Sequence, residues 1–92
     1  QGVKQARLLM ELRESYRRQV AEKPKSLALL DHLFANPYIT ASRVESLLGV
    51  TAPTARQAIA HLVQEGLLVE TTGRTWGRLY VAQPILDALQ MR

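Results

Sequence analysis

The segment spanning residues 38–81 constrains the fold more than any other part of the sequence. It contains two short amphipathic runs separated by Gly49, Val50 and Thr51, and the second run ends at Gly66. A glycine takes the left-handed conformation that ends a helix at no steric cost, and a threonine side chain caps the helix that follows. Residues 67–81 then supply two strand-like runs around a loop that contains glycine. We therefore predict a helix-turn-helix followed by a β-hairpin.

The second helix of this motif is expected to bury one face and to expose the other. The apolar stripe repeats every three or four residues and consists of Ala55, Ala58, Ile59, Leu62 and Val63. The opposite face has no acidic residue before Glu65 and carries Pro53, Arg56, Gln57, Ala60, His61 and Gln64. Arginine and glutamine pair with guanine and adenine edges in the major groove of DNA. This face is therefore the predicted DNA-recognition surface.

Candidate phosphate contacts surround this helix. Arg43 lies on the preceding helix, while Thr51 and Thr54 stand at the helix start, where hydroxyl and backbone N–H groups bind phosphate. Other interpretations of these residues are simpler. Glu45 lies close to Arg43 in the sequence and offsets its charge, and Thr54 is also a helix-capping residue. An exposed helix face is also commonly polar, so these residue types do not by themselves establish DNA contact.

The loop at residues 72–77 is the candidate wing, because its glycines allow the chain to reverse. Its expected DNA contacts are Arg74, Thr75 and Arg78, along a minor groove or a row of phosphates. Trp76 in the same loop is more typical of packing on its own hairpin or of protein contact than of base stacking. The predicted fold is a winged helix-turn-helix, mainly α with a small antiparallel β-hairpin, preceded by a long N-terminal helix.

The N-terminal segment is the source of that long helix. Residues 3–22 contain no glycine or proline, and strong helix formers dominate. One side of the helix is apolar, with Leu8, Leu9, Leu12, Tyr16 and Val20. We expect residues 1–24 to form a linker or dimerisation helix and residues 25–92 to form the winged-helix domain. The candidate contacts with a second copy or with a preceding domain are Leu9, Leu12, Tyr16 and Trp76.

The positive charge of the chain is unevenly distributed. Residues 1–25 carry seven cationic and three acidic side chains, whereas residues 26–92 carry five of each. Arg7 with Glu11, and Glu14 with Arg17 and Arg18, are spaced for solvated pairs within one helix. By sequence, then, the charge excess lies outside the winged helix, which weakens the argument for DNA binding and favours a protein-interaction module.

Several other functions have little support in the sequence. There is no cysteine, so disulfides and thiolate metal sites are excluded. No apolar run approaches the roughly 20 residues that cross a bilayer, so we expect a cytoplasmic protein without membrane contact. The two histidines, His32 and His61, lack the spacing of a metal site, and no serine or threonine stands with a plausible base. We expect no catalytic residue, no metal and no cofactor in this chain.

A series of short motifs resembles the C-terminal winged-helix domain of Fic (filamentation induced by cAMP) family proteins. The motifs are LLDHLFANPYIT at residues 29–40, LLGVTAPTA at 47–55, EGLL at 65–68, TGR at 72–74 and RLYV at 78–81. The likeness covers residues 27 to about 90. It implies a full-length parent that transfers AMP from ATP to a protein hydroxyl, with the N-terminal helix leading from its catalytic domain. The His-Pro-Phe motif of that chemistry is absent, so no catalytic residue is carried over.

A second likeness concerns the recognition helix alone. The run TARQAI at residues 54–59 is similar to the recognition helix of GntR-type repressors, in which the arginine at the position of Arg56 reads DNA. The sequence therefore predicts a module that binds double-stranded DNA, an accessory domain of a Fic-type adenylyltransferase with a role in regulation or localisation. The alternative is a winged-helix module for protein interaction or dimerisation that does not bind DNA.

Overall fold

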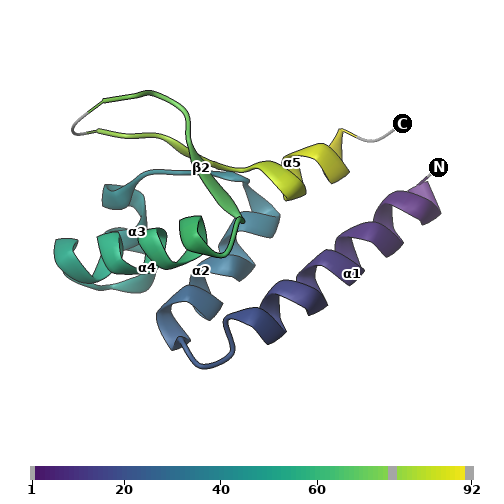
Figure 1. Cartoon of the computed structure of the whole chain (residues 1–92), viewed down its shortest axis with the longest axis horizontal. Helices are drawn as coiled ribbons and strands as arrows, with labels where there is room; N and C mark the ends of the chain where they lie inside the picture. Colours follow the sequence, from purple (N-terminus) through teal and green to yellow (C-terminus); the bar gives the residue numbers. More distant parts are fainter. Residues whose placement is uncertain (1, 75–76, 91–92) are drawn as a thin grey trace.

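The computed structural model describes residues 2–74 and 77–90 of the chain. Its elements follow in the order α1 (Gly2–Gln19), α2 (Pro24–Ala35), β1 (Tyr38–Ile39), α3 (Ala41–Leu48), α4 (Ala52–Gln64), β2 (Leu68–Glu70), β3 (Tyr80–Ala82) and α5 (Gln83–Leu89) (Figure 1). The small antiparallel sheet has the strand order β1-β3-β2. The fold is a winged helix-turn-helix that begins with a long helix, and the predicted fold class is confirmed.

Local signals set the turn between α3 and α4. Gly49 ends α3 with a φ of 63°, in the left-handed region that the sequence analysis expected. The hydroxyl of Thr51 then accepts a hydrogen bond from the Thr54 backbone N–H at 3.4 Å, which caps the start of α4. Thr40 caps α3 in the same way, by accepting from the backbone N–H of Arg43 at 3.2 Å. These caps fix where α4 begins and therefore which of its side chains point outward.

Helix α2 is the centre of the domain and packs against α1, α3 and α4. Its side chains Leu29, Leu30 and Leu33 are fully buried, because the apolar residues lie around much of its circumference. The inner face of α4 meets them, with Leu62 fully buried and Ile59 nearly so. Only one side of α4 is therefore buried in this core. The other side of α4 is exposed to solvent and accessible to a partner.

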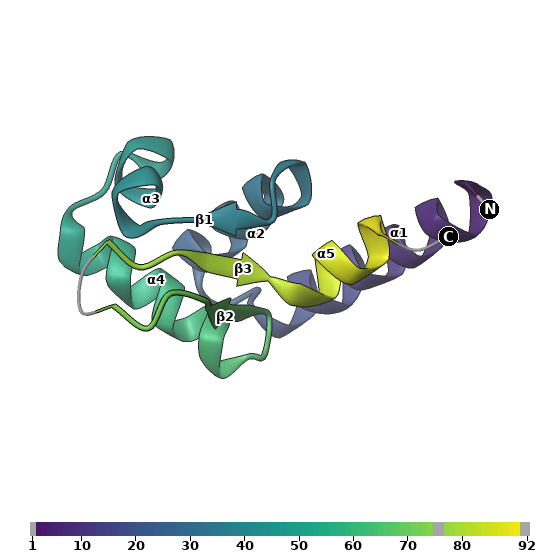
Figure 2. The ribbon, with the colours of Figure 1, turned by 90° about the horizontal axis from the view of Figure 1, so that it is seen from above.

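The sheet places the hairpin beside α4. Strand β3 pairs with β1 on one edge and with β2 on the other, with Tyr38 opposite Val81 and Leu68 opposite Ala82. The backbone N–H of Thr71 donates to the carbonyl of Leu79 at 2.8 Å, which extends the pairing toward the loop. Figures 1 and 2 show that the hairpin reaches toward the end of the molecule where α4 begins. The wing and the start of α4 therefore share one end of the molecule.

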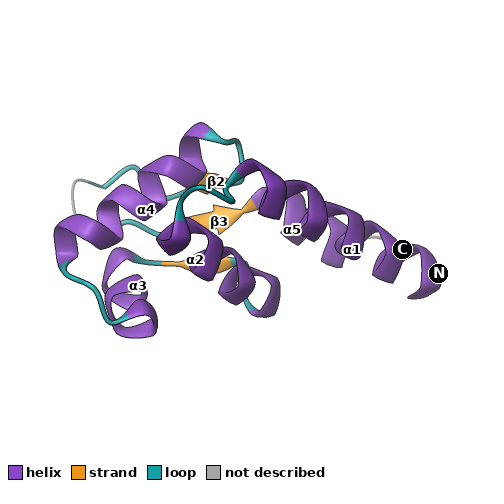
Figure 3. Cartoon of the chain, turned by 90° about the horizontal axis from the view of Figure 1, so that it is seen from below, coloured by secondary structure: helices purple, strands orange, loops and turns teal. Residues whose placement is uncertain are grey.

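Helix α1 is joined to the winged helix by several contacts within the chain. It packs on α5 and α2, and Figure 3 shows α1 and α5 side by side at the end away from the α3–α4 turn. Val20 is fully buried, and Leu9 and Tyr16 pack against the core. The Gln5 side-chain amide donates to the carbonyls of Ala88 and Leu89 at 3.1 and 2.8 Å. Leu9 and Tyr16 thus have partners in their own chain, and contact with a second copy stays a prediction.

The structure differs from the sequence-based expectation at two helix positions. Helix α1 ends at Gln19 rather than at residue 22, and a turn continues to Pro24. Val63, which the periodic pattern assigned to the buried stripe, is 41% exposed. At about 100° per residue, Val63 lies a quarter turn from the centre of that stripe, so it falls on the flank of α4 instead of facing the core.

Candidate nucleic-acid interface

The outward face of α4 has the side chains that the sequence analysis singled out. Arg56, Gln57 and Gln64 are exposed, and the small residues Pro53 and Ala60 lie between them. None of these five side chains is acidic. The inner side of the same helix is buried in the core, so the helix is held rigidly while this face stays open. Arginine and glutamine on an exposed helix face are side chains that can pair with base edges.

One flank of α4 borders an open groove beneath the hairpin. The groove has a volume of about 970 Å³ and lies between α4, the start of α3 and the hairpin. Arg56 and Val63 line it from α4, and Glu70, Arg78 and Tyr80 line it from the hairpin side. The structure thus brings the predicted recognition residue Arg56 and the predicted wing residue Arg78 to the same groove.

The other flank of α4 borders a smaller recess of about 170 Å³ at the start of α2. Lys23 and Lys25 line this recess together with Gln57 and His61 of α4. Both lysines are exposed. We inferred from the sequence that the positive charge excess lies away from the winged helix. For Lys23 and Lys25 this inference was wrong, because both lie beside α4. Charge counting along the sequence does not show their position beside α4, although two lysines around Pro24 at a helix start are a visible signal.

From the sequence, His61 was expected to project freely into solvent. In the structure it does not. Its side chain is 19% exposed, and Nδ1 lies 2.9 Å from the hydroxyl of the buried Ser26 on α2. Its Nε2 lies 3.9 Å from Glu65, whose carboxylate also accepts a hydrogen bond from Gln19. The helix angle explains the difference, since position 61 falls on the flank that faces the start of α2. His61 therefore fastens α4 to α2, and DNA contact by it has less support than contact by Arg56 or Gln57.

The wing is held at its base by a carboxylate. Glu70 accepts hydrogen bonds from the hydroxyl and backbone N–H of Thr72 and from the backbone N–H of Gly73. The Thr72 hydroxyl and, to a smaller extent, these N–H groups and the charge of Arg78 hold the pKa of Glu70 below its usual value. Arg78 also donates from Nε to the carbonyl of Arg74. The wing base is thus ordered by short-range contacts that a strand pattern does not reveal.

The remaining predicted DNA contacts divide into three groups. Arg74, Arg78 and Arg43 are exposed. The Thr51 and Thr54 hydroxyls are already used at the helix start, where Thr51 caps α4 and donates to Thr54 at 3.1 Å. Thr75 and Trp76 lie outside the described residues. The structure therefore exposes cationic side chains on the hairpin, on α3 and at the start of α2, of which Arg78, Lys23 and Lys25 border α4.

The comparisons with known proteins give no match that would indicate the role of this surface. No protein-family model matches the chain, and no curated protein matches it. Within the described residues, no helix is long and apolar enough to cross a membrane, and no group of three or more metal-ligating side chains occurs. What this surface does must therefore be argued from its own residues.

Proposed function

We propose that this chain is a winged-helix module that binds double-stranded DNA through α4. The observation that carries the proposal is the exposed face of α4, which has Arg56 and Gln57 and no acidic side chain. Lys23 and Lys25 lie on one flank of this face, and the exposed Arg78 of the hairpin lies beside Glu45 and Glu70 on the other.

In the proposed complex α4 enters the major groove. A helix is about 10–12 Å wide with its side chains, which matches a groove of about 12 Å. Arg56 donates two hydrogen bonds to a guanine, and Gln57 or Gln64 pairs with an adenine edge. The phosphates on either side of the groove contact Lys23, Lys25 and the wing arginines, which orient the helix without reading sequence.

The first experiment is a salt titration of binding to a 30-base-pair duplex selected from a random pool. The logarithm of the binding constant should fall with the logarithm of the salt concentration, at a slope of roughly −0.9 per phosphate contacted. The double variant Lys23→Gln/Lys25→Gln should make this slope shallower by about 2. The matched control, Lys4→Gln/Arg7→Gln, removes the same charge from the far end of α1 and should leave the slope unchanged. Equal effects of the two double variants would argue against the proposed flank.

We further propose that this module belongs to a Fic-type AMP transferase, where it localises or autoregulates the enzyme. This step depends on the sequence resemblance. The position of α1 is consistent with it, because α1 precedes the winged helix as a connecting arm would. The test is the coding sequence of the full-length gene. A His-Pro-Phe motif followed by an acidic residue and Gly-Asn-Gly-Arg upstream of this module supports the assignment, and a full-length gene without that motif removes it.

A second candidate function is protein interaction through α1. It is favoured by the exposure of Val3 and Met10, which are 74% and 71% exposed on the first half of that helix. The two residues are seven positions apart and so lie on one face of the helix. A contiguous exposed apolar patch marks a contact surface. Sedimentation equilibrium at high protein concentration tests this. A dimer that the variant Val3→Lys/Met10→Lys converts to a monomer supports the candidate, and a monomeric unsubstituted chain contradicts dimerisation.

A further inference from the structure

The groove between α4 and the hairpin has the dimensions of a small-molecule site. Its volume of about 970 Å³ lies at the upper end of the roughly 300–1,000 Å³ that is usual for ligand pockets. Three elements from different parts of the sequence form its walls, namely the start of α3, one flank of α4 and the hairpin. Such a concave surface covers a compact ligand on several sides, which a flat helix face cannot do.

Apolar side chains make up most of the groove surface. Ile59, Ala60 and Val63 contribute from α4, Ala41 contributes from α3, and Tyr80 contributes from β3. Val63 is 41% exposed although it is a β-branched apolar residue inside a concavity. Covering this surface with an apolar group removes it from water, which favours binding of a hydrophobic body.

Within the described part of the chain, the groove lining has two cationic side chains, Arg56 and Arg78, and two acidic ones, Glu45 and Glu70, which differ in how far their polar atoms are already used. Arg56 and Arg78 both line it, and among the residues that the structure describes neither has a carboxylate oxygen within 4.0 Å. Glu70 also lines the groove, but its carboxylate oxygens already accept hydrogen bonds from Thr72 and Gly73. Among the described residues, Arg78 donates only from Nε, to the carbonyl of Arg74, and Arg56 donates no side-chain hydrogen bond, so guanidinium N–H groups remain for a ligand. Glu45 is the other acidic side chain of the lining.

We infer that this groove binds a small, largely apolar molecule that carries one carboxylate or sulfonate group. The apolar body covers Val63 and Tyr80, and the anionic group pairs with Arg56 and Arg78. Hydrogen bonds between ionised partners are stronger than neutral ones, so the anion adds both affinity and orientation. The inference goes beyond DNA binding and does not depend on it, because the ligand needs only the groove.

The probe for this site is 8-anilinonaphthalene-1-sulfonate, an aromatic sulfonate whose fluorescence rises in an apolar environment. We expect saturable binding of one probe per chain in the absence of DNA. The variant Val63→Asp should weaken binding about tenfold, because it places a negative charge on the apolar floor beside the sulfonate. The matched control is Val69→Asp, which changes a valine that is 48% exposed on β2 and does not line the groove. That variant should bind the probe as the unsubstituted chain does.

A second arm tests the anionic contact. The double variant Arg56→Gln/Arg78→Gln should weaken binding of the sulfonate about tenfold but leave binding of the neutral N-phenyl-1-naphthylamine unchanged. Backbone amide shifts locate the probe, and those of residues 60, 63 and 80 should move most. Equal losses in Val63→Asp and Val69→Asp, or binding without saturation, would overturn the site. Equal losses of both probes in the arginine variant would overturn the anionic contact. Circular dichroism of each variant confirms that it is folded.

Discussion

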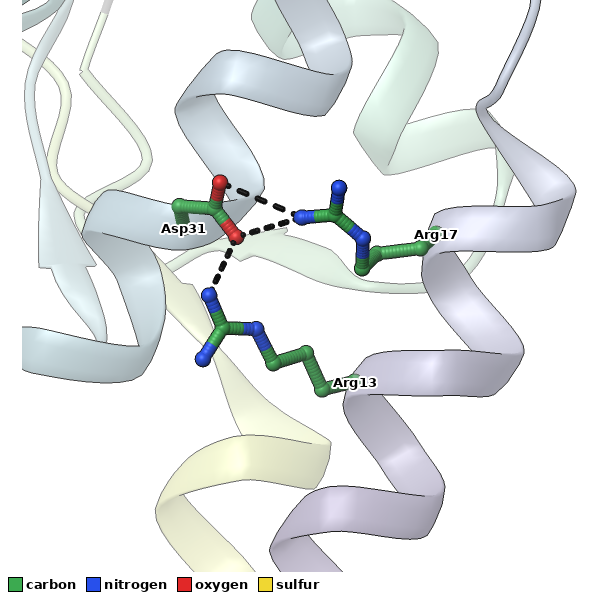
Figure 4. A network of polar contacts seen from close by, with 3 residues as sticks. All are labelled: Arg13, Arg17 and Asp31. Carbon is green, nitrogen blue, oxygen red and sulfur yellow. Dashed lines mark hydrogen bonds and ion pairs between the residues drawn. The ribbon is translucent and has the colours of Figure 1, made fainter.

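Helices α1 and α4 both carry arginine, four in α1 and one in α4, but differ in what these side chains contact. In α1, Arg13 and Arg17 both reach the carboxylate of Asp31 on α2 at 2.9 Å (Figure 4). The guanidinium carbon of Arg13 also lies 6.0 Å from the ring centroid of Phe34. In α4, Arg56 is exposed and has no such ion pair among the described residues. The number of arginines on a helix therefore says less about binding than their distance from acidic neighbours.

The charges of the two helices therefore have different uses: those of Arg13 and Arg17 pair within the chain, and that of Arg56 is available to a partner. The side chains of Arg13, Arg17 and Asp31 are 43–51% exposed, so each ion pair contributes little, in the range of 0–1 kcal/mol. Burial of Val20 and packing of Leu9 and Tyr16 hold α1 in place more strongly. The arginines of α1 orient a helix that is already packed, whereas Arg56 stands on a helix with a buried inner side and has no ion pair within residues 2–74 and 77–90.

The largest expected effect contrasts the two sides of α4. Leu62→Ala removes a fully buried side chain and leaves a cavity, so the free energy of unfolding should fall by about 2–5 kcal/mol. Gln64→Ala on the exposed side should change it by less than about 0.5 kcal/mol. Urea denaturation followed by circular dichroism measures both. Similar losses in the two variants would mean that α4 does not have one buried and one open side.

The next effect contrasts the arginines of the two helices directly. Arg56→Ala should weaken binding to the selected duplex by about 1–3 kcal/mol, because a bidentate base contact is lost. Arg13→Ala removes the same charge from α1 and should leave the affinity within error, because that guanidinium pairs with Asp31. Fluorescence anisotropy with labelled DNA measures both variants. An unchanged affinity in Arg56→Ala would remove this residue from the proposed interface.

A smaller effect concerns the ion pairs of α1. Asp31→Asn abolishes the shared carboxylate charge and so both pairs, and the free energy of unfolding should fall by at most about 2 kcal/mol because the pairs are exposed. The loss should shrink further in high salt, since exposed charges are screened. Thermal melts at low and high salt check this. A loss of several kcal/mol would show that these pairs, rather than apolar packing, hold α1.

The smallest effect is the pH response of the wing. The pKa of Glu70 is lowered in the folded protein, chiefly by the Thr72 hydroxyl, so its contacts stabilise the wing at pH values above the ordinary value of 4.5. This contribution is lost as the pH falls below 4.5 and through the lowered folded pKa. Backbone amide shifts of Thr72 and Gly73 should therefore move in that acidic range, and Glu70→Gln should abolish the movement. Identical titrations of the two proteins would contradict the role of Glu70.

The parts of the fold that depend on neighbours in sequence could be predicted. Gly49 and Thr51 act within their own turn, and the order of helices and strands followed from such local signals. Features that depend on how helices pack could not be predicted. The contact of His61 with Ser26, 35 residues earlier, needs the angle between α2 and α4. The presence of Lys23 and Lys25 beside α4 depends on the same angle.

The central claim is that α4 and its two flanks form the DNA-binding surface, whereas α1 does not. The most direct measurement is the change in backbone amide shifts when a selected duplex is added. We expect the largest shifts in residues 53–64, at Lys23 and Lys25, and in residues 70–74 and 77–78, with little change in the first half of α1. Shifts confined to α1, or no shifts even at low salt, would contradict the claim.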